Sequence, residues 1–412
     1  MYRVPRATER HGVSAARVVF ELIRDGRAIS HAELTRAAAF DADTVQHALE
    51  QLRASGLVVA AGRATEGHAS AYAVNPRAGC GIGVHLDRSY LRAVCVDAAL
   101  IVQRSVERPV RPRQQEMYAA VRGAVQTLRS VAGPIWGVGI ASPRLLNERV
   151  TDVTLEDELW ATLWGEAANR RLSEELGLPV VAENDANAGA LGEMWFGAAR
   201  NLDSFAYLFL GHGLGCGLVS RRRLIRGGWS NAGEIGLLPR SALDPTRVEH
   251  ALSLDALLAL LPTERGALLH RLGAMIQGHA ELVQHWYAEC GPLLSWVTGL
   301  LETLLDPQAV LIGSYLPASA LERLIGAAYP LGRSIAARPD RLLPRLTAGA
   351  QAHHAISLGA AMAPLLAAAD PHRASGWTVI GRFADLYAGM TSGPPAPAAP
   401  RDEAPVRPAR QV

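Results

Sequence analysis

From Cys80 onward, short apolar runs rich in β-branched residues alternate with stretches of helical periodicity. This alternation constrains the fold most, because strands separated by helices are typical of a large α/β domain. GIGVHLDRSYLRAVCVDAALIVQRSVE alternates like paired strands around a turn, and four further runs predict strands: WGVGIAS, PVVAEN, SFAYLFLG and AVLIGS. Helices are predicted at MYAAVRGAVQTLRSV and EAANRRLSEELG, and helical patterns dominate from about residue 251.

One predicted strand ends on three polar residues, Glu183, Asn184 and Asp185, ahead of a stretch of small residues. One interpretation is a helix start, where Asn and Asp side chains satisfy free N–H groups. The other is a ligand site at the carboxyl end of a strand, where open α/β sheets bind their ligands. A helix start needs one cap and the sequence supplies three polar groups, so we favour the ligand site.

Residues 12–76 have a different pattern. Helical stretches occur at SAARVVFELIRD, ISHAELTRAAAF and DADTVQHALEQLRASG. Ser30 and Glu33 form a capping box for the second helix, while Asp41 is placed to cap the third and Gly56 to end it. LVVAAG and ASAYAV predict two strands around a turn that runs from Gly62 to His68. Three short helices and a β-ribbon together predict a winged helix-turn-helix domain.

This pattern predicts that the third helix reads double-stranded DNA and that its apolar stripe, formed by Val45, Ala48, Leu49 and Leu52, faces the core. The candidate DNA-binding residues lie on the outward side of the helices and in the wing: Ser30, Asp43, Thr44, Gln46, His47, Arg63 and His68. The alternative is a protein-interaction module or a small bundle with no role at DNA. Residues 1–27 hold six Arg against three acidic residues, so this arm is the expected phosphate-contacting part.

The overall composition leaves the partner open. All 41 basic residues are arginine and the net charge is +2, which neither favours nor excludes DNA. The four cysteines form no CxxC pair, which predicts buried, reduced thiols. No apolar run reaches 18 residues, so we expect a cytoplasmic protein without a membrane partner. The Pro/Ala-rich tail, residues 385–412, is expected to be disordered, and whether WTVIGRFADLYAG, just before GPPAPAAPRDEAPVRPARQV, docks on the domain is left open.

A winged helix followed by AENDANAGALGEMWFG, GHGLGCGLV, NAGEIG and DPQAVLIGSYLP resembles the ROK family of repressors, open reading frames and sugar kinases. The resemblance covers roughly residues 12–368. It implies an α/β fold with a small N-terminal α+β domain: a winged helix-turn-helix, then an actin/hexokinase-like two-lobed ROK domain at residues 79–369. The N-terminal domain resembles the transcriptional branch of the family.

The resemblance also implies a sugar site. Asn184 and Asp185 resemble the family pair that binds sugar hydroxyls, and in the kinases this aspartate is the base that activates the attacking hydroxyl. Glu234 resembles a sugar-binding glutamate, and Glu249 stands where the family has another. Carboxylates and amides offer convergent acceptors and donors to vicinal hydroxyls.

Departures from the family pattern argue against catalysis. The Asp-x-Gly-Gly-Thr turn that holds ATP phosphates reads His85-Leu86-Asp87-Arg88-Ser89 here, and the second phosphate turn has His212 where Thr is usual. We therefore expect no cofactor. The zinc ligands of the family are missing too: Leu237 replaces the His and the Cys cluster is absent, so we expect no metal. His353 and His354 are expected at the surface.

Arg144 replaces a family glycine at the cleft. Its guanidinium would pair with an anionic ligand such as a sugar phosphate, or pair internally with an acid such as Glu183 and occlude the pocket. The sequence thus predicts a repressor that binds a palindromic operator as a homodimer or dimer of dimers and senses a sugar or sugar derivative. The alternatives are an active ATP-dependent sugar kinase and a DNA-binding regulator with a vestigial cleft.

Overall fold

The computed structural model describes residues 14–26, 28–65, 68–130, 133–143, 164–262, 271–369, 378–383 and 386. They form two compact units: one comprises Met1–Asn75 with Asp385–Val412, and the other comprises Pro76–Ala384. Each unit is described on its own below.

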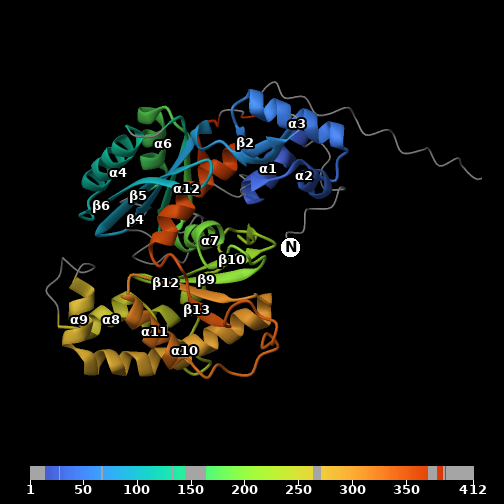
Figure 1. The fold of residues 1–412 in the computed structure, drawn as a ribbon. Helices are drawn as coiled ribbons and strands as arrows, with labels where there is room; N and C mark the ends of the chain where they lie inside the picture. The colour runs from blue at the N-terminus through green and yellow to red at the C-terminus, as the bar shows by residue number, and fades with distance from the viewer. Residues whose placement is uncertain are drawn as a thin grey trace, which may run out of the picture. The chain divides into compact units, whose positions relative to one another are not determined.

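The N-terminal unit, shown in blue in Figure 1, packs three helices beside a small antiparallel sheet of strand order β1-β3-β2. Its elements are α1 (Ala15–Gly26), β1 (Ala28–Ile29), α2 (His31–Ala38), α3 (Ala42–Ala54), β2 (Val58–Thr65) and β3 (His68–Val74). The capping box of Ser30 and Glu33 is confirmed, and so is Asp41 as the N-cap of α3. The predicted stripe on α3 is buried: Val45, Ala48, Leu49 and Leu52.

The end of α3 shows why Gly56 stands where it does. Gly56 has φ of 75°, its N–H donates to the Arg53 carbonyl (3.0 Å), and the Leu57 N–H donates to the Leu52 carbonyl (3.0 Å). These two bonds close a Schellman motif, in which glycine adopts the left-handed conformation at no steric cost. The predicted turn from Gly62 to His68 is wrong, because β2 continues to Thr65 and β3 begins at His68, with a bulge between Ala61 and Ala64. The strand ends could not be predicted because the residues there are mostly small and show no apolar–polar alternation.

The larger unit contains two sheets, and the predicted strands are found in them. The six-stranded sheet has the order β14-β8-β7-β4-β5-β6, and the five-stranded sheet has the order β11-β10-β9-β12-β13. The strands are β4 (Cys80–Leu86), β5 (Tyr90–Asp97), β6 (Val102–Pro109), β7 (Ile135–Ser142), β8 (Val180–Asn184), β9 (Phe205–Leu210), β10 (Leu214–Ser220), β11 (Arg223–Leu224), β12 (Val310–Ser314), β13 (Leu346–Ala348) and β14 (Thr378–Ile380). The short β14 pairs antiparallel with β8, so this part of the segment left open by the sequence is docked.

Helices α7 (Asp185–Phe196) and α12 (His354–Ala369) lie side by side between the two sheets, α12 against β4 and β7 and α7 against β9 and β10 (Figure 1). Their backbones approach so closely that a Cβ at Gly359 would lie 1.7 Å from the Ala188 carbonyl oxygen, and one at Gly192 would lie 1.9 Å from that of Ala355. The small residues after Asp185 are therefore required by this helix–helix contact, since only small side chains permit such an approach.

The remaining helices cover the outer faces of the sheets. Apolar side chains of α4 (Gln114–Arg129) and α6 (Glu166–Leu176) pack against β4, β5 and β7, while those of α10 (Ala280–Leu305) and α11 (Ala318–Ala327) pack against β9 and β12. Two short helices, α8 (Leu254–Leu260) and α9 (Leu272–Gly278), precede α10. None of the described helices is long and apolar enough to cross a membrane. All four cysteines are buried thiols.

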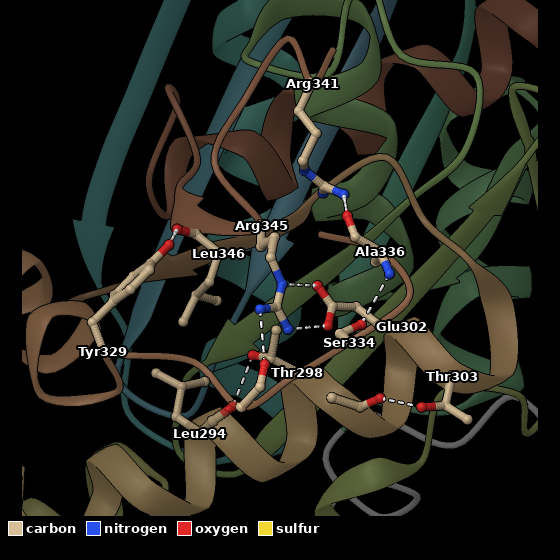
Figure 2. A network of polar contacts seen from close by, with 12 residues as sticks. Leu294, Thr298, Glu302, Thr303, Tyr329, Ser334, Ala336, Arg341, Arg345 and Leu346 are labelled. Carbon is tan, nitrogen blue, oxygen red and sulfur yellow. Dashed lines mark hydrogen bonds and ion pairs between the residues drawn. The ribbon is translucent and has the colours of Figure 1, made fainter. Parts of the chain in front are cut away.

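A buried ion pair joins α10 to the segment that enters β13 (Figure 2). Arg345 Nε and one terminal nitrogen donate to the two oxygens of Glu302 (2.7 and 2.5 Å), and its other terminal nitrogen donates to the Gly332 carbonyl (2.9 Å). The Glu302 side chain is 0% exposed. Burial opposes its ionisation, but the hydrogen bonds from Arg345 keep the pKa of Glu302 below its ordinary value.

Candidate functional site

A pocket in the larger unit brings together four of the five residues that the sequence predicts to bind ligand. Asn184, Asp185, Glu234 and Glu249 all line it, with Pro143 and the glycine-rich turn between β9 and β10. The other lining residues are Asp87, Phe209, Gly211, His212, Gly213, Leu214, Gly215 and Leu237. Arg144 falls outside the described residues.

Asn184 and Asp185 owe their position to the junction of β8 and α7. Asn184 is the N-cap of α7, and its Oδ1 accepts the N–H groups of Ala186 (2.9 Å) and Asn187 (3.2 Å). Asp185 occupies the first turn of α7 and is 7% exposed. A carboxylate at this place is stabilised by the helix dipole. The two interpretations of this sequence are therefore compatible, because the residue that caps the helix also lines the pocket.

Glu183 is not part of the pocket lining. Arg226 donates to both of its carboxylate oxygens, at 3.0 Å to Oε1, and Glu183 also accepts the Asn184 N–H (2.9 Å) and the Asn187 side-chain amide (3.2 Å). This buried ion pair fixes the end of β8. Glu183, which the sequence offers as an internal partner for Arg144, is thus already bound by Arg226, and nothing in the sequence singles out Arg226.

Glu234 lies just before the short 3-10 helix η3 (Ile235–Leu237), and Glu249 lies in a second one, η4 (Val248–His250). Glu234 directly precedes η3 and follows Gly233, which has φ of 101° and where a Cβ would lie 1.9 Å from the Cys216 carbonyl oxygen, so this position requires glycine. Glu249 lies in η4 with one carboxylate oxygen 3.0 Å from where a Cβ on Gly213 would stand. The carboxylates therefore come from separate loops that converge on the β9–β10 turn.

Two lining residues of the pocket, Asp87 and His212, form a cluster with Arg88 and Asp255 that we call the His212 bridge. His212 Nδ1 donates to Asp255 (2.6 Å), His212 Nε2 lies 3.5 Å from Asp87, and Arg88 lies 3.3 Å from Asp255. Burial disfavours the imidazolium, but Asp87 and Asp255 more than offset this and raise the pKa of His212. Burial likewise opposes ionisation of Asp87, yet His212, His85 and the Tyr315 hydroxyl keep the pKa of Asp87 below its ordinary value.

In the sequence, these positions are noticed only because they depart from the two phosphate-binding turns of the family. The signal that could have identified the cluster is that the first turn gained Asp87 while the second gained His212, two side chains that can carry opposite charge.

A cluster of aromatic and histidine side chains contacts the His212 bridge through Asp87. The Tyr315 hydroxyl donates to Asp87 (2.5 Å), and the Tyr315 ring stacks on His85 with centroids 6.0 Å apart. The ring centroid of His353 lies 5.3 Å from that of Tyr315 and 4.1 Å from that of His354. The predicted surface position of His353 and His354 is wrong, since both rings are half-buried and burial lowers their pKa to about 3 and about 4. Among the described residues no group of three or more His, Cys, Asp or Glu is placed to hold a metal ion.

The predicted DNA-binding residues lie on the N-terminal unit. Asp43 and His47 are exposed on α3, and Thr44 and Gln46 are half-buried. Several already have local partners: Thr44 donates to Asp41 (2.9 Å), Gln46 to Glu50 (2.8 Å), and the Ser30 hydroxyl to Glu33 (2.7 Å). Arg63 lies in β2 within the bulge between Ala61 and Ala64, and His68 pairs with Thr65 at the start of β3, but the side chains of Arg63 and His68 fall outside the described set.

Comparison with known proteins connects this pocket to a family. Residues 63–247 match the ROK family. The chain is 28% identical over 232 residues to a putative xylose repressor of Caldicellulosiruptor sp. (strain Rt8B.4), which covers 53% of this chain and 57% of that protein. It is 36% identical over 110 residues to a beta-glucoside kinase of Listeria monocytogenes, over 25% of this chain and 35% of the kinase. The chain thus spans a little over half the length of the repressors it matches.

Solved structures show the same fold. A ROK family transcriptional regulator, a homolog of the E. coli MLC protein, superposes with a TM-score of 0.64 at 20% identity, over 88% of this chain and 97% of that chain. A ROK family glucokinase from Streptomyces griseus, solved with glucose and AMPPNP, gives a TM-score of 0.54 at 24% identity, over 69% of this chain and 98% of that chain. The larger unit therefore has the actin/hexokinase-like α/β fold.

Proposed function

Because this chain carries a ROK family domain, we propose that it is a transcriptional repressor whose DNA affinity is set by a sugar bound in the pocket of the larger unit. DNA binding is assigned to residues 12–76, as a winged helix-turn-helix, and ligand binding to residues 79–369. The protein acts in the cytoplasm on a palindromic operator, as a homodimer or a dimer of dimers.

One observation carries this proposal. The pocket gathers Asn184, Asp185, Glu234 and Glu249, which suit sugar hydroxyls, while its phosphate-turn positions are filled by Asp87 and His212, which face each other 3.5 Å apart. A site of this kind retains the groups that grip a sugar and replaces those that hold a phosphate donor. Sugar recognition without phosphoryl transfer is what a sensor requires.

The described lining favours an uncharged sugar over a sugar phosphate. Four carboxylates line the pocket, and its basic group, His212, already faces Asp87 and Asp255. A phosphate would meet this acidic surface at a Coulombic cost, whereas ring hydroxyls donate to it. The names of the relatives supply two probes: D-xylose from the xylose repressors and D-glucose from the glucokinase.

The test is calorimetry of the full chain with D-xylose, D-glucose and D-glucose 6-phosphate. We expect one of the neutral sugars to bind and the phosphosugar not to bind. Asp185→Asn should weaken binding about tenfold or more, because a hydrogen bond to a charged group contributes about 1.5–3 kcal/mol. Asp203→Asn, a change at an exposed aspartate, serves as the control. Preference for the phosphosugar, or equal binding by Asp185→Asn and wild type, would refute the assignment.

An active sugar kinase is the second candidate, and one observation favours it: Asp185 lines the pocket beside the glycine-rich turn, and a beta-glucoside kinase is among the relatives. Phosphoryl transfer depends on positioning a donor and stabilising its charge. We expect no ATP-dependent phosphorylation of D-xylose or D-glucose above background. Turnover of about 1–100 s⁻¹ that disappears in Asp185→Asn would establish the kinase instead.

A further inference from the structure

His212 joins three segments that are far apart in sequence. It projects from the β9–β10 turn, and its two ring nitrogens face Asp87 in the β4–β5 turn and Asp255 in the first turn of α8. A backbone bond from Leu254 N–H to the Gly211 carbonyl (2.8 Å) ties the β9–β10 turn to α8 in any protonation state. The Arg88–Asp255 ion pair (3.3 Å) likewise joins the β4–β5 turn to α8, so the contact between His212 and Asp87 is the one between the two turns that a change in the charge of His212 weakens.

The charged and titratable groups around His212 come from each packed element. Asp87 and Arg88 face it from the β4–β5 turn, Asp255 from α8, and His85 from β4, and Tyr315 reaches it through Asp87. Glu249 of η4 lies against the same turn at Gly213. The two carboxylates favour a protonated imidazole, whereas burial and Arg88 oppose it. A neutral imidazole has a single N–H donor, so it cannot attract both carboxylates.

We propose that His212 is a positioning residue that controls the pocket by its protonation: the imidazolium holds the β4–β5 and β9–β10 turns together, and the neutral ring loosens the β4–β5 turn, which Arg88 and Tyr315 still anchor, and weakens ligand binding. The effect on ligand rests on the proposed function, because it assumes that the pocket binds a sugar. The bridging itself does not depend on that assumption.

The pocket geometry explains how such a release would reach the ligand. Asp87 and Gly211–Gly213 are lining residues, and the following Gly215 lies against Asp185, whose Oδ1 is 3.7 Å from where a Cβ on Gly215 would stand. Loosening of the β4–β5 turn moves Asp87, which lines the pocket, whereas the β9–β10 turn beside Asp185 stays bonded to α8.

The direction with pH follows from the raised pKa of His212. The bridge is complete below about pH 6.5, the ordinary histidine pKa, and is lost as the pH rises through the higher pKa of His212 in the folded chain.

Hydrogen–deuterium exchange of the full chain tests the bridge without a ligand. We compare wild type with His212→Gln, which keeps a hydrogen-bonding group but no charge, in peptides covering residues 85–90 and 211–216. At pH 6.0 the variant should exchange about fivefold faster or more, a typical lower limit for coupled sites. The difference should shrink as the pH is raised to 9.0. His250→Gln, at an exposed histidine, should match wild type at both pH values.

Calorimetry with D-xylose and D-glucose at the same two pH values tests the effect on ligand. Wild type should lose about fivefold or more in affinity at pH 9.0, and His212→Gln should show the weaker affinity throughout. Equal exchange of wild type and His212→Gln at pH 6.0, or a difference that does not shrink between pH 6.0 and pH 9.0, would overturn the bridge. An affinity of wild type that does not change with pH would overturn its control of the pocket.

If neither sugar binds while exchange behaves as expected, the bridge is supported and the sugar assignment alone fails. If His212→Gln does not fold, Asp255→Asn replaces it, and protection in that variant should be lost at a lower pH than in wild type. Loss at the same pH would overturn the bridge.

Discussion

Asn184 shows how one residue serves folding and recognition together. Its side chain caps α7 through two backbone N–H groups and lines the pocket from the same position. Such a residue is readable from sequence, because both roles follow from its place between a strand and a helix. Asp87 and His212 are different. They lie more than 120 positions apart in the chain, and only the packing of two sheets brings them within 3.5 Å.

His85 should make the larger unit sensitive to acid. Burial lowers its pKa to about 4, so the folded chain keeps it neutral while the unfolded chain protonates it below about pH 6.5. The stability it contributes above pH 6.5 is lost as the pH falls toward 4, by about 2 kcal/mol at pH 5. All eight tryptophans follow Asn75, so their fluorescence reports unfolding of this unit.

The measurement is urea unfolding of wild type and His85→Gln at pH 7.5 and 5.0. The loss of unfolding free energy between these pH values should be about 2 kcal/mol smaller in the variant. His250→Gln should retain the wild-type pH dependence. Identical pH dependence in wild type and His85→Gln would contradict the buried neutral state.

At the level of elements, α3 separates its two faces cleanly. Val45 and Leu49 are buried, whereas Asp43 and His47 are exposed. Caps at both ends set its length from local sequence alone, which is why its bounds could be predicted. By contrast, the ends of β2 and β3 could not be, because the small residues between Ala61 and Ala71 carry no signal until the strands pair.

Replacing Thr44, Gln46 and His47 together by Ala should abolish selective DNA binding, since each lost base contact costs about 1–3 kcal/mol. Helix content by circular dichroism should be retained, because none of the three is fully buried. Binding-site selection from a random DNA library provides the readout. The double variant Gln115→Ala, Gln126→Ala on the exposed face of α4 is the control. A folded triple variant that selects the wild-type site would show that α3 does not read the bases.

The Glu302–Arg345 pair between α10 and β13 makes a second prediction at this level. Arg345→Met leaves a buried carboxylate without its partner and should cost about 3–5 kcal/mol of unfolding free energy. The double variant Glu302→Leu, Arg345→Met removes both charges and should recover most of this loss. Tryptophan-monitored urea unfolding measures both. A single variant that loses less than about 1 kcal/mol would mean that the pair is solvated in solution.

For the whole molecule, the sequence predicts the alternation of strands and helices because each element is specified by its own periodicity. It does not predict the order of the strands or the placement of α7 and α12 between the sheets. These depend on long-range contacts such as Gly192 with Ala355 and Gly359 with Ala188. The candidate pocket was predicted in four of its residues through the family resemblance. The His212 bridge was not predicted, because its residues come from distant turns and meet only once the two sheets are packed.

A repressor controlled by sugar also requires that the two units communicate. A ligand changes DNA affinity only by binding differently to the DNA-competent and DNA-incompetent states, and the coupling is reciprocal. Sugar affinity and operator affinity must therefore change together, and by the same factor.

The most direct measurement of this claim is fluorescence anisotropy of the full chain on its selected operator, titrated with the neutral sugar that calorimetry identifies. We expect the sugar to weaken operator binding by about 5- to 150-fold in wild type. Asp185→Asn should stay bound over the same sugar range, and Asp203→Asn should be released like wild type. No sequence-selective binding by the wild-type chain, or release that is identical in Asp185→Asn, would contradict a repressor that senses sugar in this pocket.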